Sequence, residues 1–333
     1  MQMKAAWYER RGAAREVLHV GEMERPEPKP GEVLVRVHAS GVNPSDTKSR
    51  TGLGARPNPW PRIIPHQDGA GRIESVGEGV DQGRIGERVW IYEAQLGRPF
   101  GCAAEYVAVP AANAVSLPDN ISFEEGACLG VPALTAHRCV FADGSVEGKT
   151  VLVTGGAGAV GYYAVQFAKL GGAQVIATVS RDEQAKVARE AGADFIINRR
   201  EEDVAGRIAE LTGASDGRGV DRIVDVAFGA NLETSLKILK VRGVIASYAS
   251  DEVPVPALPF WPLAGLDATV RFVLVYVMGE QAHVEAIKAT GDALSSGRLK
   301  HRIGARFTLD RIVEAHEALE SGRTIGKVVV AVP

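Results

Sequence analysis

Three glycines near the middle of the chain have the spacing with the clearest chemical meaning. Gly156, Gly158 and Gly161 form the pattern GxGxxG, which follows the apolar run 151–153 and opens the helix-like run 160–168. Without side chains, the backbone can turn sharply and approach a phosphate, which the first N–H groups of the helix then hold. In this context the spacing predicts a dinucleotide pyrophosphate site, with a purely structural turn as the alternative. Its residues would be Gly156, Gly158, Ala159, Val160 and Gly161.

The residues after the next apolar run indicate which dinucleotide binds. The adenosine ribose is read about 20 residues beyond such a glycine turn, and Ser180 stands there. A carboxylate would accept from a 2′-hydroxyl, but Arg181 follows instead, and Lys186 comes soon after. Because a guanidinium binds phosphate through several charge-assisted hydrogen bonds, we expect NADPH. Two alternatives stay open: Asp182 could accept from the ribose of NADH, and the basic residues could belong to a solvated helix start.

Alternating strand and helix patterns surround the glycine turn and predict the fold that positions it. Fully apolar strands separated by helices are typical of a parallel, doubly wound α/β sheet, the Rossmann architecture. We expect six strands, at Thr150–Thr154, Gln174–Val179, Asp194–Asn198, Arg222–Ala227, Gly243–Tyr248 and Ala268–Tyr276. The expected helices are Val160–Leu170, Glu183–Ala191, Val204–Thr212 and Gln281–Ser296.

The first third of the chain is rich in strand patterns instead. Short alternating runs punctuated by glycine and proline predict a small barrel or sandwich. The runs are Glu32–His38, Gly69–Val76, Arg88–Tyr92 and Ala104–Val109, with a long loop at 50–65. Ser122 and Glu125 form a capping-box pattern, which predicts a helical stretch towards Val140. The tail, with an expected helix at 309–321 and strand at 327–332, is too short for a domain and should pack on another part.

Composition bounds the classes of function. The chain has 333 residues with a net charge of −3, so no general positive field attracts nucleic acid or an anionic membrane surface. Three cysteines without CxxC spacing argue against a cysteine-rich structural zinc site and favour a reducing compartment. The N-terminal residues lack the apolar core of a signal peptide, and the run 270–278 is too short to cross a bilayer. We therefore expect a cytoplasmic protein without a membrane or nucleic-acid partner.

Several short motifs occur in an order that resembles one family. They are Gly41-Val42-Asn43-Pro44-Ser45-Asp46, Asp68-Gly69-Ala70-Gly71, Val76-Gly77-Glu78-Gly79-Val80, Gly86-Glu87-Arg88-Val89, Leu134-Thr135-Ala136, the glycine turn and Gly326-Lys327-Val328-Val329. Together they resemble the zinc-independent, zeta-crystallin-like quinone oxidoreductase branch of the medium-chain dehydrogenase/reductase superfamily, over essentially the whole chain. The resemblance implies a GroES-like β-rich barrel domain at 1–124 and 299–333, and a Rossmann NADPH-binding domain at 125–298.

The resemblance also indicates whether the chain has the ligands for a catalytic zinc ion. Zinc alcohol dehydrogenases of this superfamily have a cysteine near position 43 and a histidine near 66, and this chain has Asn43 and His66. Because catalytic zinc needs three protein ligands, we expect no metal, and a structural or cleft role for His66. Without a Lewis acid, the acceptor must already be electrophilic, as a quinone or an α,β-unsaturated carbonyl is. The expected reaction is therefore hydride transfer from NADPH to such an acceptor, with the proton taken from water.

Individual site residues follow from the resemblance. It implies that Asn43 donates to the acceptor carbonyl, although Asn-Pro is also a turn signal. Thr135 matches a threonine on the nicotinamide side, and Tyr92 is a candidate for the substrate wall. Lys48 stands where relatives often have tyrosine, so it could approach a phosphate or an anionic substrate. The remaining cofactor candidates are Arg199, Phe228, Tyr248, Ala249, Ser250, Phe272, Val273, Leu274 and Lys327.

Two further expectations concern partners and alternatives. An apolar strand at 268–276 would lie on the sheet edge, where relatives pair it with a second subunit, so we expect a homodimer. One alternative function is an enoyl-thioester reductase of the same superfamily, which would need a basic patch for its phosphorylated carrier. The other is a non-enzymatic, crystallin-like NADPH-binding protein.

Overall fold

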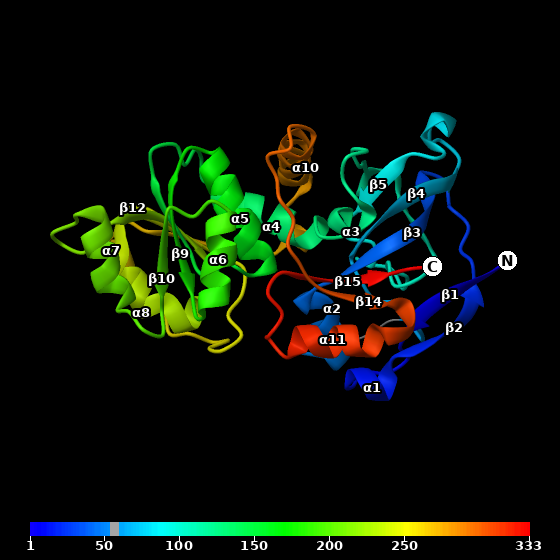
Figure 1. The fold of residues 1–333 in the computed structure, drawn as a ribbon, viewed down its shortest axis with the longest axis horizontal. Helices are drawn as coiled ribbons and strands as arrows, with labels where there is room; N and C mark the ends of the chain where they lie inside the picture. Colours follow the sequence, from blue (N-terminus) through cyan, green and yellow to red (C-terminus); the bar gives the residue numbers. More distant parts are fainter. Residues whose placement is uncertain (54–59) are drawn as a thin grey trace. The chain divides into compact units, whose positions relative to one another are not determined.

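The computed structural model describes residues 1–53 and 60–333 (Figure 1). The chain divides into two compact units. The first contains Met1–Val131 and Gly291–Pro333, and the second contains Pro132–Thr290. Each of the two chain boundaries falls inside a helix, α4 (Gly130–Phe141) or α10 (Glu280–Ser295).

The second unit is built on a six-stranded sheet in which every pairing is parallel. The strand order is β10-β9-β8-β11-β12-β13. This is the expected doubly wound sheet, with the chain reversing its direction of travel across the sheet after β10. The strands are β8 (Thr150–Val153), β9 (Gln174–Val179), β10 (Phe195–Asn198), β11 (Val220–Asp225), β12 (Leu239–Ser247) and β13 (Thr269–Phe272).

Helices cover both faces of this sheet. In Figure 1, α5 and α6 lie on one side of β9 and β10, and α7 and α8 lie on the other. One apolar core joins the second pair of helices to the sheet through buried residues such as Ile208, Ile223 and Leu232. The helices are α5 (Ala159–Leu170), α6 (Asp182–Glu190), α7 (Val204–Thr212), α8 (Phe228–Ile238) and α9 (Phe260–Gly265). The sequence reading missed α8, whose cap position, Ala227, offers no side-chain acceptor.

The edge strand β13 is shorter than the sequence predicts. It was expected over 268–276, but it ends at Phe272, and a short 3₁₀ turn follows at Val275–Val277. The neighbouring strand explains the early end. Ser247 is the last residue of β12 and pairs with Phe272, so the chain beyond Val273 has no ladder partner in the sheet.

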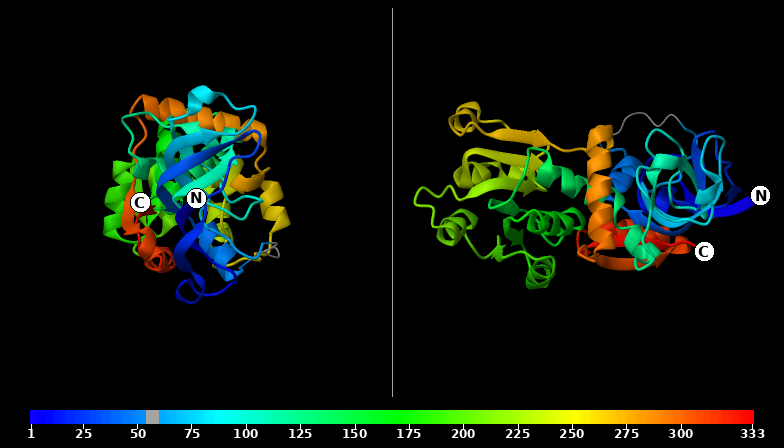
Figure 2. Two further views of the ribbon diagram at one scale, coloured as in Figure 1. Left: turned by 90° about the vertical axis from the view of Figure 1, so that its right-hand side faces the viewer. Right: turned by 90° about the horizontal axis from the view of Figure 1, so that it is seen from above.

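The first unit is β-rich, as expected. A seven-stranded sheet runs β14-β15-β3-β4-β5-β7, with β6 paired to β3, and β1 and β2 form a separate antiparallel ribbon (dark blue in Figure 2). The tail packs here, because β15 pairs with β3. The strands are β1 (Gln2–Trp7), β2 (His19–Glu24), β3 (Glu32–Val42), β4 (Asp68–Val76), β5 (Arg88–Ile91), β6 (Tyr106–Pro110), β7 (Ala114–Ser116), β14 (Ile303–Thr308) and β15 (Lys327–Ala331).

Short helices also belong to the described part of this unit: α1 (Ala14–Val17), α2 (Pro44–Thr51), α3 (Phe123–Gly126) and α11 (Ile312–Glu320). Three 3₁₀ turns accompany them, at Gln82–Arg84, Ala111–Asn113 and Leu309–Arg311. The loop expected at 50–65 begins inside α2, and its residues 54–59 lie outside the described part of the chain.

The helical stretch predicted from Ser122 towards Val140 is interrupted. Ser122 and Glu125 do form the capping box, but α3 ends at Gly126 and α4 begins at Gly130. At the start of α4 the backbone lies close to β4, since a Cβ at Gly130 would lie 2.0 Å from the Asp68 carboxylate. The close backbone approach lets Val131 N–H donate to that carboxylate at 2.9 Å.

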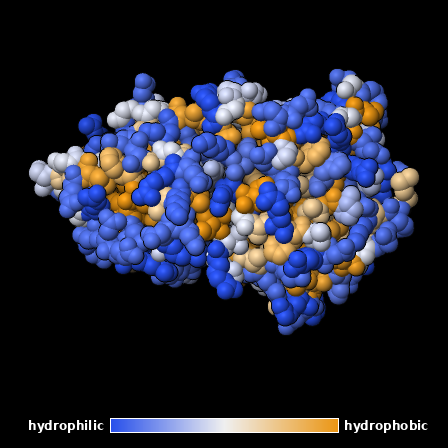
Figure 3. Space-filling model, viewed as in Figure 1, coloured by the Kyte–Doolittle hydropathy of each residue, from blue (hydrophilic) through white to orange (hydrophobic). Residues whose placement is uncertain are grey.

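The face drawn in Figure 3 is mostly hydrophilic, with apolar residues in scattered patches. Across residues 1–53 and 60–333, no helix combines the length and the apolar character that a bilayer crossing requires.

Candidate functional site

The glycine turn of the second unit is anchored to two neighbouring strands. Gly155 N–H and Gly156 N–H donate to the side chain and carbonyl of Thr178, at 3.2 and 3.1 Å. On the other side, the Thr154 hydroxyl donates to Asp225 Oδ1 at 2.8 Å and accepts from Val226 N–H at 2.9 Å. These bonds fix the turn at the carboxyl ends of β9 and β11. In an open parallel sheet, this is the edge where ligands bind.

Close packing explains why the turn needs its glycines. A Cβ at Gly161 would lie 2.2 Å from the Gly155 carbonyl oxygen, and one at Gly156 would lie 2.7 Å from the side chain of Ala177. Helix α5 begins directly after Gly158, and its first backbone bond runs from Tyr162 N–H to the Gly158 carbonyl at 2.8 Å. The N–H groups of the first helical turn therefore precede any intrahelical acceptor and suit an anion.

Basic residues gather at the end of β9. Arg199 Nε donates to Ser180 Oγ at 2.9 Å, and its backbone N–H donates to the Val179 carbonyl. Arg181 is the N-cap residue of α6, and Lys186 is exposed on the same helix. The structure thus brings Ser180, Arg181 and Arg199 together. Asp182 is exposed in the first turn of α6.

Other cofactor candidates lie at the ends of β11, β12 and β13. The rings of Phe228 and Phe272 meet edge to face at 5.1 Å. Phe228 N–H donates to the Ala249 carbonyl, and Ser250 Oγ accepts from Gly229 N–H, both at 3.0 Å. Val273 is buried, whereas Leu274 is exposed and Tyr248 is half-buried. Thr135 is buried within α4.

In the first unit, Asn43 belongs to a buried charged cluster with Asp68 and Lys327. Lys327 Nζ forms an ion pair with Asp68 Oδ2 at 2.8 Å, and it also donates to Asn43 Oδ1. Asn43 Nδ2 donates to the same carboxylate oxygen at 2.7 Å. All three side chains are at most 2% exposed. Because the ammonium holds the amide oxygen, the Asn43 side chain cannot flip.

A second buried carboxylate supports Asn43 from the backbone side. Asp46 Oδ2 accepts from Asn43 N–H at 2.7 Å, which caps α2, and Asp46 Oδ1 accepts from Gln67 N–H at 3.2 Å. Burial, followed by the charge of Asp68, raises the pKa of Asp46 to about 7. Sequence reasoning missed Asp46 and Asp68 as site residues, although both stand within the quoted family motifs.

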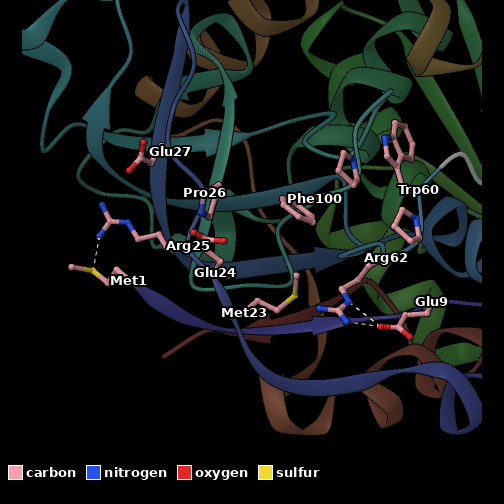
Figure 4. A pocket seen from close by; sticks show the side chains of 12 residues that line it. Met1, Glu9, Met23, Glu24, Arg25, Pro26, Glu27, Trp60, Arg62 and Phe100 are labelled. Atoms are coloured by element: carbon pink, nitrogen blue, oxygen red, sulfur yellow. Dashed lines mark hydrogen bonds and ion pairs between the residues drawn. The ribbon is translucent and has the colours of Figure 1, made fainter.

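The remaining two candidates of this unit are not in the cluster's hydrogen bonds. Tyr92 follows β5, is buried, and has its pKa raised to about 12 by burial. Lys48 is half-buried on α2. A separate surface cavity of about 840 Å³ is lined by Met23, Trp60 and Phe100, beside an ion pair between Arg62 and Glu9 (Figure 4). None of the predicted site residues lines it.

Buried histidines make the fold sensitive to acid. Burial lowers the pKa of His137 and His301 to about 4 and that of His316 to about 3, and it holds the pKa of His66 well below its usual value. Below about pH 6.5 the unfolded chain takes up protons at these positions while the folded chain does not, so stability falls. Asp46 acts in the opposite direction, because its raised pKa favours the folded state as pH falls below 7.

Each of these groups changes the free energy of unfolding by up to about 1.4 kcal/mol per pH unit. The loss from the four histidines therefore exceeds the gain from the single aspartate. We therefore expect the free energy of unfolding, measured in urea, to fall steadily between pH 6.5 and 5. The exposed His19 supplies a control, and His19→Gln should follow the same curve. A free energy that is constant over this range would contradict the prediction.

Comparisons with known proteins agree with this architecture. The family described as "Alcohol dehydrogenase GroES-like domain" matches residues 29–119, and the family described as "Zinc-binding dehydrogenase" matches residues 159–289. A quinone oxidoreductase of Pseudomonas aeruginosa is 33% identical over 324 residues, covering 95% of this chain and 95% of that protein. The human quinone oxidoreductase is 31% identical, covering 89% of this chain and 88% of that protein.

Solved structures of quinone oxidoreductases are also similar to this chain over nearly its whole length. The quinone oxidoreductase of Escherichia coli complexed with NADPH has a TM-score of 0.85 at 29% identity, covering 98% of this chain and 99% of that one. That of Pseudomonas syringae has a TM-score of 0.86 at 32% identity, covering 99% of both chains. The chain therefore belongs to the medium-chain dehydrogenase/reductase superfamily and is an oxidoreductase. Within the superfamily, it belongs to the quinone oxidoreductase branch.

Proposed function

We propose that the protein transfers a hydride from NADPH to a quinone or another α,β-unsaturated carbonyl, without zinc. The observation that carries this proposal is the Asn43–Asp68–Lys327 cluster, which offers an oriented amide and a cation but no open metal position. The glycine turn with its basic surroundings supports a phosphorylated dinucleotide. Relatives named quinone oxidoreductases support the acceptor class.

The side chains present do not fit a catalytic zinc ion. Asn43 has an amide in place of an anionic ligand, and both ring nitrogens of His66 are engaged, with Ser40 and with His316. The Asp68 carboxylate is already neutralised by Lys327, whose ammonium would repel a second cation. Among residues 1–53 and 60–333, no three histidine, cysteine or acidic side chains converge in a way that suits a metal ion.

The cluster residues can stabilise the charge that a conjugated acceptor develops. When bound, NADPH supplies a hydride, and the acceptor's carbonyl oxygen becomes negative. Asn43 Nδ2 keeps one N–H beyond its bond to Asp68, and Lys327 adds a positive charge beside it. A proton from water then completes the reduced product. The first-turn N–H groups of α5 would hold the pyrophosphate. Thr135 is our candidate for the nicotinamide side, and Tyr92 is our candidate for the substrate wall.

Acceptor specificity can be tested directly. Loss of NADPH absorbance should be followed with quinones, simple enones, an enoyl thioester and a simple ketone. We expect turnover with quinones or enones and none with the simple ketone, and chelation of zinc should leave the rate unchanged. Preference for the enoyl thioester would instead identify a thioester reductase. NADPH binding without turnover of any acceptor would indicate a binding protein.

Coenzyme choice should depend on Arg181. We expect Arg181→Ala to raise the KM for NADPH about 10- to 100-fold, the equivalent of losing charged hydrogen bonds to a phosphate. The KM for NADH should change little, because that coenzyme lacks the 2′-phosphate. Arg189→Ala removes the same charge from the exposed last turn of α6 and serves as the control. Equal losses for NADPH and NADH would show that Arg181 does not read the phosphate.

A homodimer is part of the proposal. Among residues 1–53 and 60–333, the edge strand β13 pairs with β12 and with no second strand. Phe272 in this strand (65% exposed) and Leu274 just after it (55%) are exposed apolar side chains, as is Trp261 (79%) on the preceding helix α9. Such an edge normally needs a partner strand. Sedimentation equilibrium should give twice the mass of one chain, whereas a single-chain mass at micromolar concentration would contradict pairing. The three cysteines are free, buried thiols, which supports a reducing, cytoplasmic setting.

A further inference from the structure

A buried row of polar side chains in the first unit is not used by the proposed reaction. Ser40 Oγ lies 2.7 Å from His66 Nδ1, and His66 Nε2 lies 3.0 Å from His316 Nε2. Arg50 Nε donates to His316 Nδ1 at 3.3 Å. The Arg50 guanidinium also donates to Glu320 and to the Gly12 carbonyl. Ser40, His66, His316 and Arg50 are fully buried.

Arg50 determines which atom donates and which accepts in each hydrogen bond of this row. A guanidinium has donors but no acceptor, so His316 Nδ1 must accept, and the proton of a neutral His316 ring must be on Nε2. His316 then donates to His66 Nε2, which leaves the His66 proton on Nδ1, facing Ser40. The serine hydroxyl is in turn 3.5 Å from the Asp68 carbonyl oxygen. Because arginine stays protonated, this row orients groups and does not conduct protons.

Both rings must be neutral for the row to exist. A second proton on His66 would be on Nε2 and would face the His316 Nε2–H group across 3.0 Å. A second proton on His316 would be on Nδ1 and would face the Arg50 Nε–H group across 3.3 Å. Burial lowers the pKa of both histidines, which keeps them neutral at physiological pH. His66 also has a left-handed backbone, with φ of 81°, which a side-chain residue holds only where its surroundings enforce it.

The row joins the elements that supply the charged cluster. Arg50 is on α2, the helix that begins immediately after Asn43, and His66 is two residues before Asp68 at the start of β4. His316 is on α11, the last helix before β15, which starts at Lys327. The row therefore holds the segments next to the cluster residues: α2 next to Asn43, the residues before β4 next to Asp68, and α11 before Lys327.

We propose that the Ser40–His66–His316–Arg50 row is a positioning device that sets the orientation of the Asn43 amide and the Asp68 carboxylate for the acceptor. Its histidines have fixed tautomers, with the proton of His66 on Nδ1 and that of His316 on Nε2. The kinetic consequence rests on the proposed function, whereas the tautomers and the Asn43 orientation do not. The experiment therefore includes readouts of both kinds.

The first readout is the proton position on each ring, measured by ¹⁵N NMR of histidine-labelled protein. We expect His66 to carry its proton on Nδ1 and His316 on Nε2, both neutral at pH 7. Ser40→Ala and His316→Gln assign the two rings. The reverse tautomers, or a charged ring at pH 7, would overturn the proposal regardless of activity.

The second readout is the Asn43 side-chain amide signal, assigned with Asn43→Ala. His316→Leu breaks the row and should shift this signal, whereas His316→Gln, which keeps a donor and an acceptor, should largely preserve it. The exposed His19→Leu is the matched control and should change nothing. An unshifted Asn43 signal in folded His316→Leu would overturn the proposal.

The third readout separates positioning from stability. Per folded molecule, His316→Leu should lower kcat/KM for the acceptor about tenfold, with partial rescue in His316→Gln and an unchanged Kd for NADPH. A role in stability alone would lower Tm and leave kcat/KM unchanged, which would also overturn the proposal. If the wild type reduces no acceptor, the proposed function fails, and the two NMR readouts still decide whether the row positions Asn43.

Discussion

Replacing Lys327 with methionine is expected to lower the free energy of unfolding by about 3–5 kcal/mol, because it leaves a buried carboxylate without its counter-ion. Asp68 is fully buried and would retain only the N–H donors of Asn43 and Val131. Lys327 also lowers the pKa of Asp46, so its loss should favour protonation of that second buried acid. Urea denaturation at pH 7 measures the change.

Two further variants make this result specific. Adding Asp68→Asn to Lys327→Met removes the uncompensated charge and should recover part of the stability. Lys4→Met is the matched control, because Lys4 is only half-buried and pairs at 2.6 Å with an exposed Asp310, and such solvent-accessible pairs contribute about 0–1 kcal/mol. If Lys327→Met is no more destabilising than Lys4→Met, the ion pair of Lys327 with Asp68 does not hold the cluster together.

The sequence predicted well whatever depends on local patterns. All six strands of the parallel sheet and the glycine turn follow from apolar runs and residue spacing within short windows. The capping box of Ser122 and Glu125 is likewise a local signal, and the structure confirms it. Helix α8 was missed for the same reason, since it lacks a side-chain cap and its apolar face, with Phe228 and Leu232, packs into a core formed by distant parts of the chain.

The polar cluster and the histidine row could not be predicted in this way. Asn43 and Lys327 are 284 positions apart, and His66 and His316 are 250 apart, so no window of sequence contains either pair. The resemblance named Asn43 and Lys327 separately, without the carboxylate that joins them. The length of β13 also depended on a distant feature, the end of β12 at Ser247.

Gly161→Ala should sharply weaken NADPH binding. The added Cβ would lie 2.2 Å from the Gly155 carbonyl oxygen, so either the turn or α5 must move. Overpacking of this kind costs about 1–3 kcal/mol. The displaced first-turn N–H groups would then hold the phosphate less well. A loss of binding free energy of this size raises the Kd for NADPH roughly 5- to 150-fold. Quenching of protein fluorescence on NADPH addition measures the Kd.

A control variant must show that the effect comes from the close contact at Gly161 and not from replacing any glycine. Gly291→Ala is the control, because a Cβ there meets no atom within 4 Å and alanine favours the helical conformation of α10. That variant should bind NADPH as the wild type does and be slightly more stable. Folded Gly161→Ala with wild-type affinity would show that the dinucleotide does not depend on the close contact between α5 and the turn, and the pyrophosphate site would have to be sought elsewhere.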